Sequence, residues 1–364
     1  MCCLVLCRMY RYGVTCLLLA WITIGSVTHA ARGRSNEDRS HSRGGSVEPN
    51  VCDLGPTERA YCYCDNNDIR MAKEASCWVF SDCKSDDPIW DVFVTQPFIN
   101  RFKLLVRPDS SLDFIPTRAI RYLKNLKNLE IQYAGITVVP SYAFANSSTM
   151  EDISLTRNHI EKVLPEAFAH LPKLNRLTLD ENRISVLVAS TFEGVPSLTQ
   201  LYVAQNNISV IEMGAFSSLR HLTELVLSKN SLSRLNRSSF IGLVRLERLD
   251  LSENSLTAIP DMAFIEMPEL RELELERNTL QSVGDMAFEG LSMLERLSLA
   301  GNQLTVFNSH ALQGSPSLRV LDLRDNELRT LTRITIEPMM ENLRNSTAYL
   351  LLTGMSPINT DAVA

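Results

Sequence analysis

The same pattern of residues returns every 24 positions, from about Phe102 to about Asn342. Each unit opens on an aliphatic residue, and these openers are Leu126, Met150, Leu174, Leu198, Leu222, Leu246, Leu270, Leu294 and Leu318. Two more aliphatic residues follow three and five places later, as Leu225 and Leu227 follow Leu222. A register kept this strictly predicts a solenoid of stacked repeats.

Two other residue types keep the same register. An asparagine recurs at Asn158, Asn182, Asn206, Asn230, Asn254, Asn278, Asn302 and Asn326, and a phenylalanine recurs from Phe144 to Phe288. The Leu-x-x-Leu-x-Leu segment has the period of a short strand with one buried face, which must pair with the same strand of the next unit. The asparagine follows the strand, where its amide can bond backbone groups of neighbouring turns. We therefore predict an α/β-type solenoid, the leucine-rich-repeat horseshoe with a curved parallel β-sheet.

The chain begins with features of an exported protein. Residues 1–30 have Arg8 and Arg11 before a short apolar run and end on a plausible cleavage site, which predicts a secretory signal peptide. Without it the chain has 36 − 2 = 34 basic and 42 acidic residues, a net charge of −8. That balance disfavours nucleic acid as a partner. Residues 31–50 have little apolar content and are expected to form a flexible, disordered leader.

Four of the nine cysteines lie in the expected signal peptide, and the other five lie in residues 51–101. This second segment is expected to form an N-terminal cap. Clustered cysteines in an exported chain favour disulfides, and a stapled cap would cover the apolar end of the first repeat. Zinc binding by Cys62 and Cys64 is the weaker alternative, because no partner pair or histidine lies nearby. The count is odd, so Cys83 is expected to pair with another chain or with a segment outside this sequence.

Ten repeats of 24 residues are expected over residues 102–341. The first is degenerate, with Phe102, Leu105 and Arg107 at the strand positions, and Ala134 replaces the asparagine of the second. Residues 342–364 form a degenerate last unit in which residues 348–352 can add a final strand, followed by a divergent tail.

Residues two, four, six and seven places after each opener should project from the concave face of the sheet. This face is the predicted site for a protein partner, and its candidate residues are Arg176, Gln200, Tyr202, Glu224, Val226, Arg248, Asp250, Glu272, Glu274, Glu276 and Arg296. Tyr202 and Val226 are expected to form an apolar spot beside an acidic patch with arginines among the acids. A solvated sheet face with no partner is the alternative.

Four N-glycosylation sequons are present, at Asn146, Asn207, Asn236 and Asn345, and the three inside the array all miss the concave positions. The six histidines are scattered, and no zinc-protease, nucleophile-elbow or dinucleotide motif is present. We therefore expect that the protein is not an enzyme and that it binds no cofactor, metal or small-molecule substrate. Paired carboxylates for glycoside chemistry would lack a dry pocket on an open sheet.

The segments outside the repeats are more specific than the repeats themselves. CYCDNN at residues 62–67, DDPIW at 86–90 and VRPDSSLDFIPTRAI at 106–120 resemble the connectin-like leucine-rich-repeat adhesion proteins of insects, over about residues 51–354. The resemblance implies homophilic cell adhesion, a part in nerve-muscle target recognition, and attachment outside the cell by a glycolipid anchor. It also implies disulfides that join Cys52 to Cys64 and Cys62 to Cys77.

The chain departs from that family after Gly354, where relatives continue into a second cap and an anchor signal. Two explanations are open: a truncated sequence, or a secreted variant. Truncation is favoured, because an uncapped end would leave Leu350 and Leu352 poorly covered and prone to association. A soluble, secreted ligand-binding or matrix protein is accordingly the alternative function.

Overall fold

The computed structural model describes residues 49–55, 59–144, 147–308, 310–329, 331, 333–344 and 347–353, without the side chains of Glu341 and Asn342. All of them lie in the compact unit that begins at Glu48. The expected signal peptide, nearly all of the leader, Asn146, Asn345 and the tail from Gly354 lie outside the described residues.

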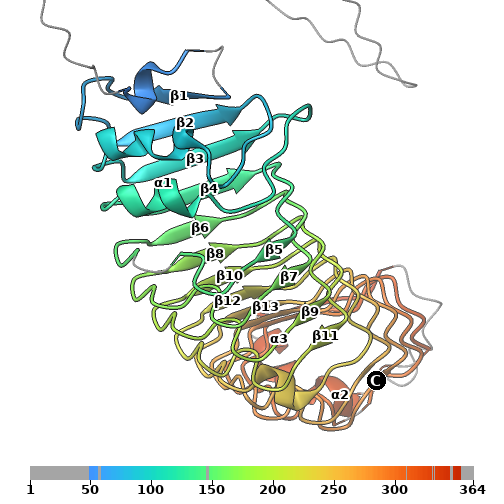
Figure 1. Cartoon of the computed structure of the whole chain (residues 1–364). Helices are drawn as coiled ribbons and strands as arrows, with labels where there is room; N and C mark the ends of the chain where they lie inside the picture. Colours follow the sequence, from blue (N-terminus) through green and yellow to red (C-terminus); the bar gives the residue numbers. More distant parts are fainter. Residues whose placement is uncertain are drawn as a thin grey trace, which may run out of the picture. The chain divides into compact units, whose positions relative to one another are not determined.

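One continuous sheet runs through the described part of the chain (Figure 1). Its thirteen strands, in spatial order, are β1 (Ala60–Cys64), β2 (Glu74–Val79), β3 (Arg101–Val106), β4 (Asn128–Gln132), β6 (Asp152–Ser154), β8 (Arg176–Thr178), β10 (Gln200–Tyr202), β12 (Glu224–Val226), β13 (Arg248–Asp250), β15 (Glu272–Glu274), β17 (Arg296–Ser298), β18 (Val320–Asp322) and β19 (Tyr349–Leu351). Strand β1 is antiparallel to β2, and every later pair is parallel. The predicted leucine-rich-repeat solenoid is therefore confirmed.

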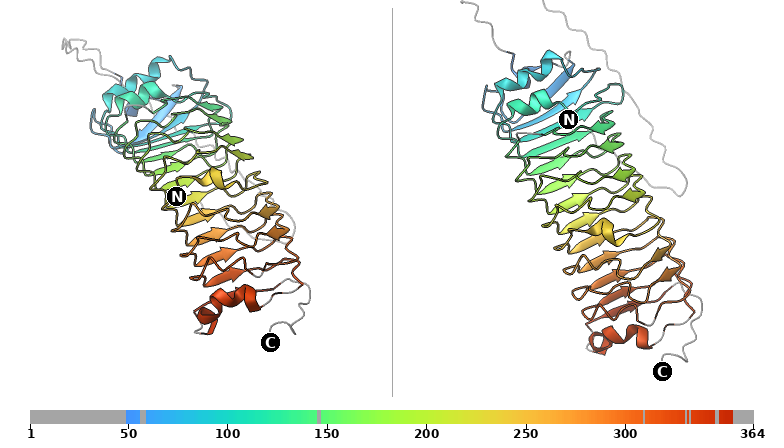
Figure 2. Two further views of the ribbon diagram at one scale, coloured as in Figure 1. Left: turned by 90° about the horizontal axis from the view of Figure 1, so that it is seen from below. Right: turned by 60° about the horizontal axis from the view of Figure 1, so that its bottom comes forward.

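The opposite side of the solenoid carries three short strand pairs and a few helical turns (Figure 2). The pairs are β5 (Val138–Val139) with β7 (Lys162–Val163), β9 (Val186–Leu187) with β11 (Val210–Ile211), and β14 (Ala258–Ile259) with β16 (Ser282–Val283). The helical turns of the chain are η1 (Val51–Asp53), η2 (Pro88–Trp90), η3 (Val92–Thr95), α1 (Thr117–Tyr122), η4 (Arg237–Phe240), α2 (Arg333–Ile336), η5 (Glu337–Met339) and α3 (Met340–Arg344). None of these helices is long and apolar enough to cross a membrane, as far as the described residues go.

The core lies between the two sides and is built from the periodic residues. Leu201, Leu225 and their equivalents are fully buried under the strands, since alternate residues of a strand face opposite ways. The phenylalanines stack on the other side of the core, where the ring centroids of Phe144 and Phe168 are 5.6 Å apart. Each fully buried side chain of this kind stabilises the fold by about 1.5–3 kcal/mol.

The recurring asparagine binds two consecutive turns of the chain, its own and the preceding one. The side-chain oxygen of Asn206 accepts from the backbone N–H of Ile184 (3.0 Å). Its Nδ2 donates to the carbonyls of Leu179 (3.0 Å), Val203 (3.2 Å) and Ala204 (3.0 Å). The same arrangement recurs from Asn182 to Asn326 in the described chain. It supplies partners to backbone groups that the three-residue strands leave unpaired.

The cap continues the sheet in a different register from the one expected. The buried residues of β3 are Phe102, Leu104 and Val106, whereas the sequence pattern placed Leu105 and Arg107 inside. Phe102 pairs with Leu129, which is a spacing of 27 residues rather than 24. The cap strand β2 keeps the same longer spacing, so β2 and β3 form a common entry to the array, and the predicted cap boundary at residue 101 falls on the first residue of β3.

The other end of the array also departs from equal repeats. The predicted final strand is present as β19, but Leu350 pairs with Leu321, 29 residues earlier. The additional residues form α2, η5 and α3, which the 24-residue pattern did not predict. Leu350 and Leu352 are only partly buried, in keeping with the sequence-based expectation.

Disulfides join Cys52 to Cys64 and Cys62 to Cys77, the pairs implied by the family resemblance. Cys83 is a free, buried thiol, and burial raises its pKa to about 11. The expected pairing of Cys83 with another chain does not fit this position, because its residue surface is only 5% exposed.

We expect Asn230→Ala to lower the free energy of unfolding by about 1–3 kcal/mol, because it leaves the buried N–H of Ile208 and several carbonyls without a partner. Urea unfolding followed by circular dichroism measures the change. Ser231→Ala, at the exposed neighbouring position, is the matched control and should be close to neutral. Equal stability of the two variants would contradict a structural role for the asparagine column.

Candidate functional site

The predicted partner-binding residues project from the large sheet on the side away from the core. They alternate with buried residues such as Leu201 and Leu273. Arg176 and Arg296 are exposed, and the other nine are partly exposed. Neighbouring strands are in register, so Gln200 lies between Arg176 and Glu224. The structure therefore brings these eleven residues onto one surface, which we call the concave face.

The acidic half of the concave face is organised around Arg248. Its guanidinium lies 2.9 Å from Glu274, 3.9 Å from Glu224 and 4.0 Å from Glu272. Arg296 lies 3.8 Å from the other side of Glu272. The expected acidic patch is thus a mixed network, in which one guanidinium serves three carboxylates.

Burial affects the ionisation of this network. Burial raises the pKa of the Glu274 carboxyl, nearby Asp250 raises it further, and Arg248 opposes both. Without Arg248, the pKa of the Glu274 carboxyl would therefore be raised further. Arg248 is thus the centre of this charge network as well as a candidate contact residue.

Tyr202 and Val226 lie side by side on β10 and β12, as expected for an apolar spot. The spot also has a polar rim, because the Tyr202 hydroxyl donates to Glu224 at 2.7 Å. Burial and this hydrogen bond raise the pKa of Tyr202 to about 12, so its hydroxyl remains a donor at neutral pH.

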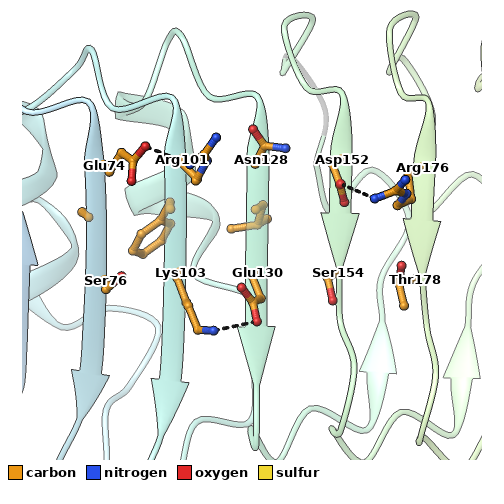
Figure 3. Close-up of a pocket in the computed structure, with 13 residues that line it drawn as sticks. Glu74, Ser76, Arg101, Lys103, Asn128, Glu130, Asp152, Ser154, Arg176 and Thr178 are labelled. Carbon is orange, nitrogen blue, oxygen red and sulfur yellow. Dashed lines mark hydrogen bonds and ion pairs between the residues drawn. The ribbon is translucent and has the colours of Figure 1, made fainter.

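A depression of about 410 Å³ lies at the N-terminal end of the same face (Figure 3). Opposite charges alternate across it: Arg101 is 2.9 Å from Glu74, Lys103 is 2.9 Å from Glu130, and Arg176 is 3.8 Å from Asp152. Four residues of this depression were not predicted from the sequence: Glu74, Ser76, Arg101 and Lys103. Their 27-residue spacing hides them from the 24-residue columns, although the alternating pattern of residues 101–106 was a usable signal.

Asp180 is the most perturbed carboxyl of the concave face. Its Oδ1 accepts a 2.7 Å hydrogen bond from the backbone N–H of Ala204, yet burial outweighs this and raises its pKa from 3.8 to about 6. Asp180 is therefore partly protonated near neutral pH. A single sequence gives no signal for this, because the burial comes from the neighbouring turns.

The sequons in the described part of the chain lie off the concave face. Asn207 and Asn236 are exposed in the turns that follow β10 and β12. No group of three or more potential metal ligands occurs among the described residues. The concave face is a broad polar surface, which is suited to protein contacts.

Comparison with known proteins identifies the repeat family. The profile described as "Leucine rich repeat" matches residues 124–184, 172–232, 220–280 and 268–328, which together make up more than half of the chain. The chain belongs to the leucine-rich-repeat family. The solenoid, its asparagine column and its parallel sheet are the shared features of that family.

A more specific similarity links this leucine-rich-repeat chain to connectin of Drosophila melanogaster. The two are 41% identical over 101 residues, a stretch that covers 27% of this chain and 15% of connectin. The chain is connectin-like over that stretch. The match spans far less than two thirds of connectin, so it does not transfer the activity of the whole protein.

Solved structures share the leucine-rich-repeat fold. A chain of the octameric complex of latrophilin 3, Unc5D and the leucine-rich-repeat protein FLRT2 is 25% identical, with a TM-score of 0.60 over 74% of this chain and 80% of that one. The Drosophila Toll–Spätzle complex contains a 21% identical chain, with a TM-score of 0.52 over 65% of this chain and 36% of that one. The second likeness concerns the fold alone.

We expect Asp180→Asn to stabilise the protein at pH 7.5 by about 1–2 kcal/mol, judged from the raised pKa. A carboxyl whose pKa is raised on folding favours the folded state at low pH, and this contribution is lost as the pH rises through about 6. The gain should therefore fall towards zero near pH 4. Urea unfolding at both pH values measures it, with the exposed Asp285→Asn as control. A gain that is equal at both pH values would contradict the assignment.

Proposed function

We propose that this protein is an extracellular adhesion or recognition protein that binds protein partners, including a second copy of itself, through the concave face. We further propose that it acts in nerve-muscle target recognition and that it is held at the cell surface by a lipid anchor. The signal-like N-terminus and the two disulfides support the extracellular location, since disulfides persist in oxidising compartments.

The observation that carries this proposal is the composition and extent of the concave face. Ten strands spaced about 4.8 Å apart span on the order of 45 Å, which is the size of a protein footprint. Arginines and carboxylates alternate along it, from Arg101 at one end to Arg296 at the other. Mixed charge of this kind favours specific partners through electrostatic complementarity.

The relatives support a role in protein recognition. Connectin is 41% identical to this chain over 101 residues. The FLRT2 structure places a similar leucine-rich-repeat chain in a complex with latrophilin 3 and Unc5D. For this chain, the partner class that follows is another cell-surface protein. Small molecules are poor candidates, because the 410 Å³ depression is an open part of the sheet surface.

Bead aggregation tests self-recognition. The mature chain, purified from secreting cells, would be coated on red and on green beads that are mixed with bare beads. We expect red and green beads to aggregate together and bare beads to stay out. Coated beads that remain dispersed, although the protein is folded, would rule out self-binding by this chain.

We expect a glycan placed on the concave face to abolish binding. Arg176→Asn creates Asn-Leu-Thr at positions 176–178, and Arg296→Asn creates Asn-Leu-Ser at 296–298. These positions lie five strand spacings apart, or about 24 Å, so the two variants probe both halves of the face. A gel shift that an endoglycosidase reverses reports whether the glycan is attached, and bead aggregation reports binding.

Three controls separate steric block from other effects. Arg176→Gln and Arg296→Gln remove the same charges without adding a sequon. Gln313→Asn creates Asn-Gly-Ser at an exposed position outside the concave columns and should leave aggregation unchanged. Undiminished aggregation by both glycosylated face variants would exclude the concave face as the contact surface.

A further inference from the structure

The strand pairs on the side opposite the concave face are not continuous: β7 and β9 of consecutive turns belong to separate pairs, and the turn between β11 and β14 has no strand. Strand β11 pairs with β9 on one side, and β14 pairs with β16 further along. Between β11 and β14, residues 234–235 occupy the equivalent place, but they form no strand in the structure. The helical turn η4 begins there instead, at Arg237. The outer edge of β11 is therefore left without a neighbouring strand.

A groove of about 200 Å³ lies at this interruption. It is lined on one side by Val210 and Ile211 of β11, and on the other by Arg234, Leu235 and Asn236. Val210 is 48% exposed, so the groove leaves apolar surface uncovered. The carbonyl of Ile211, which lacks a strand partner on this side, accepts a 3.0 Å hydrogen bond from Ser239 Oγ. The carbonyl at this edge thus has a hydrogen-bond partner, whereas the apolar side chain of Val210 remains exposed to solvent.

Both described glycosylation sequons border this groove. Asn236 lines it and starts the sequon Asn236-Arg237-Ser238. Ser209, the hydroxyl residue of the sequon that starts at Asn207, lines it as well. No other turn of the array combines a break in the strand pairs with a sequon within the described residues.

The side chain of Asn236 is already oriented by its role as the cap of η4. Its Oδ1 accepts from the backbone N–H of Ser238 (3.1 Å) and from the Ser238 hydroxyl (2.9 Å). Those bonds use the carbonyl oxygen of the amide, whereas N-glycosylation uses Nδ2. A glycan on Nδ2 keeps the carbonyl oxygen, so the cap of η4 and the sugar can coexist.

We propose that the groove between β11 and η4 is the docking site for the first N-acetylglucosamine of a glycan on Asn236. In the modification, Nδ2 forms a bond to C1 of the sugar, the lipid diphosphate of the oligosaccharide donor leaves, and one amide proton is released. The sugar then lies over Val210, the exposed apolar side chain of the groove. Its ring C–H groups and acetamido methyl cover the apolar surface that a neighbouring strand would otherwise cover. Arg234 can donate hydrogen bonds to its oxygens.

The proposal assigns this glycan a structural role that does not depend on binding through the concave face. The other described sequon gives a matched control. Asn207 is exposed and adjacent in sequence to the groove, but it is not among the groove residues. Loss of a glycan from Asn207 should therefore change solubility and mass without changing the exchange behaviour of β11.

The experiment uses the full chain secreted from animal cells. Ser238→Ala removes the sequon and keeps the cap bond from the backbone N–H of Ser238, but it loses the bond from the hydroxyl. Ser238→Thr keeps the sequon and both bonds. The two variants are therefore also compared as unglycosylated proteins, and the difference found there is subtracted as the effect of the lost hydroxyl bond. Asn207→Gln removes the other sequon. Peptide mass spectrometry reports occupancy, thermal unfolding reports stability, and hydrogen exchange reports the opening of residues 208–214. Each protein is also measured after an endoglycosidase trims its glycans to a single N-acetylglucosamine.

We expect Asn236 to be occupied. Relative to Ser238→Thr, Ser238→Ala should lower Tm by about 2 °C and increase exchange across β11, the size of change expected for loss of one modest contact in a domain of this length. Trimming to one sugar should preserve the stability of the parent. In a Val210→Ser background, which removes the apolar surface, the difference between Ser238→Ala and Ser238→Thr should disappear.

Three results would overturn the proposal. Asn236 could prove unmodified, Ser238→Ala and Ser238→Thr could have the same Tm and exchange, or the difference could persist in the Val210→Ser background. A protein that fails bead aggregation but passes these tests would refute self-adhesion alone. The reverse outcome would refute the docked glycan alone.

Discussion

Every turn of this solenoid leaves backbone N–H and C=O groups that a three-residue strand cannot pair, and the asparagine column satisfies them. Each amide bonds its own turn and the preceding turn, so the position of one strand depends on the next. Buried backbone groups without partners are costly, which explains why the column keeps its register so strictly. The leucines supply most of the burial, but leucine packing alone would tolerate slippage.

This constraint has a consequence for the concave face. The residues that alternate with the leucines make few of the bonds that hold the register, so their identity is free to vary from turn to turn. They have organised into local charge networks such as the one around Arg248, and into the alternating pairs of the N-terminal depression. The rigid backbone holds these side chains at a fixed spacing, which is the property that a recognition surface requires.

The repeat could be predicted from the sequence because its residues serve the same role in every turn. Features that depend on a single turn could not. The cap register at Phe102 follows from pairing with β2, and the helices α2 and α3 follow from the longer last turn. Likewise, Asp180 and Tyr202 owe their shifted pKa values to burial by neighbouring strands, which the spacing of residues along one strand does not encode.

The two sides of the solenoid differ because the sheet is continuous and the opposite side is not. Along the concave side, every strand from β2 to β18 has a neighbour on each side, so its surface changes only through side chains. On the opposite side the strand pairs are interrupted, and each interruption needs its own local solution. Ser239 satisfies the carbonyl of Ile211, yet a hydroxyl group cannot cover Val210. A covalently attached sugar has both apolar and polar faces, so it can meet both needs at a site where the repeat pattern fails.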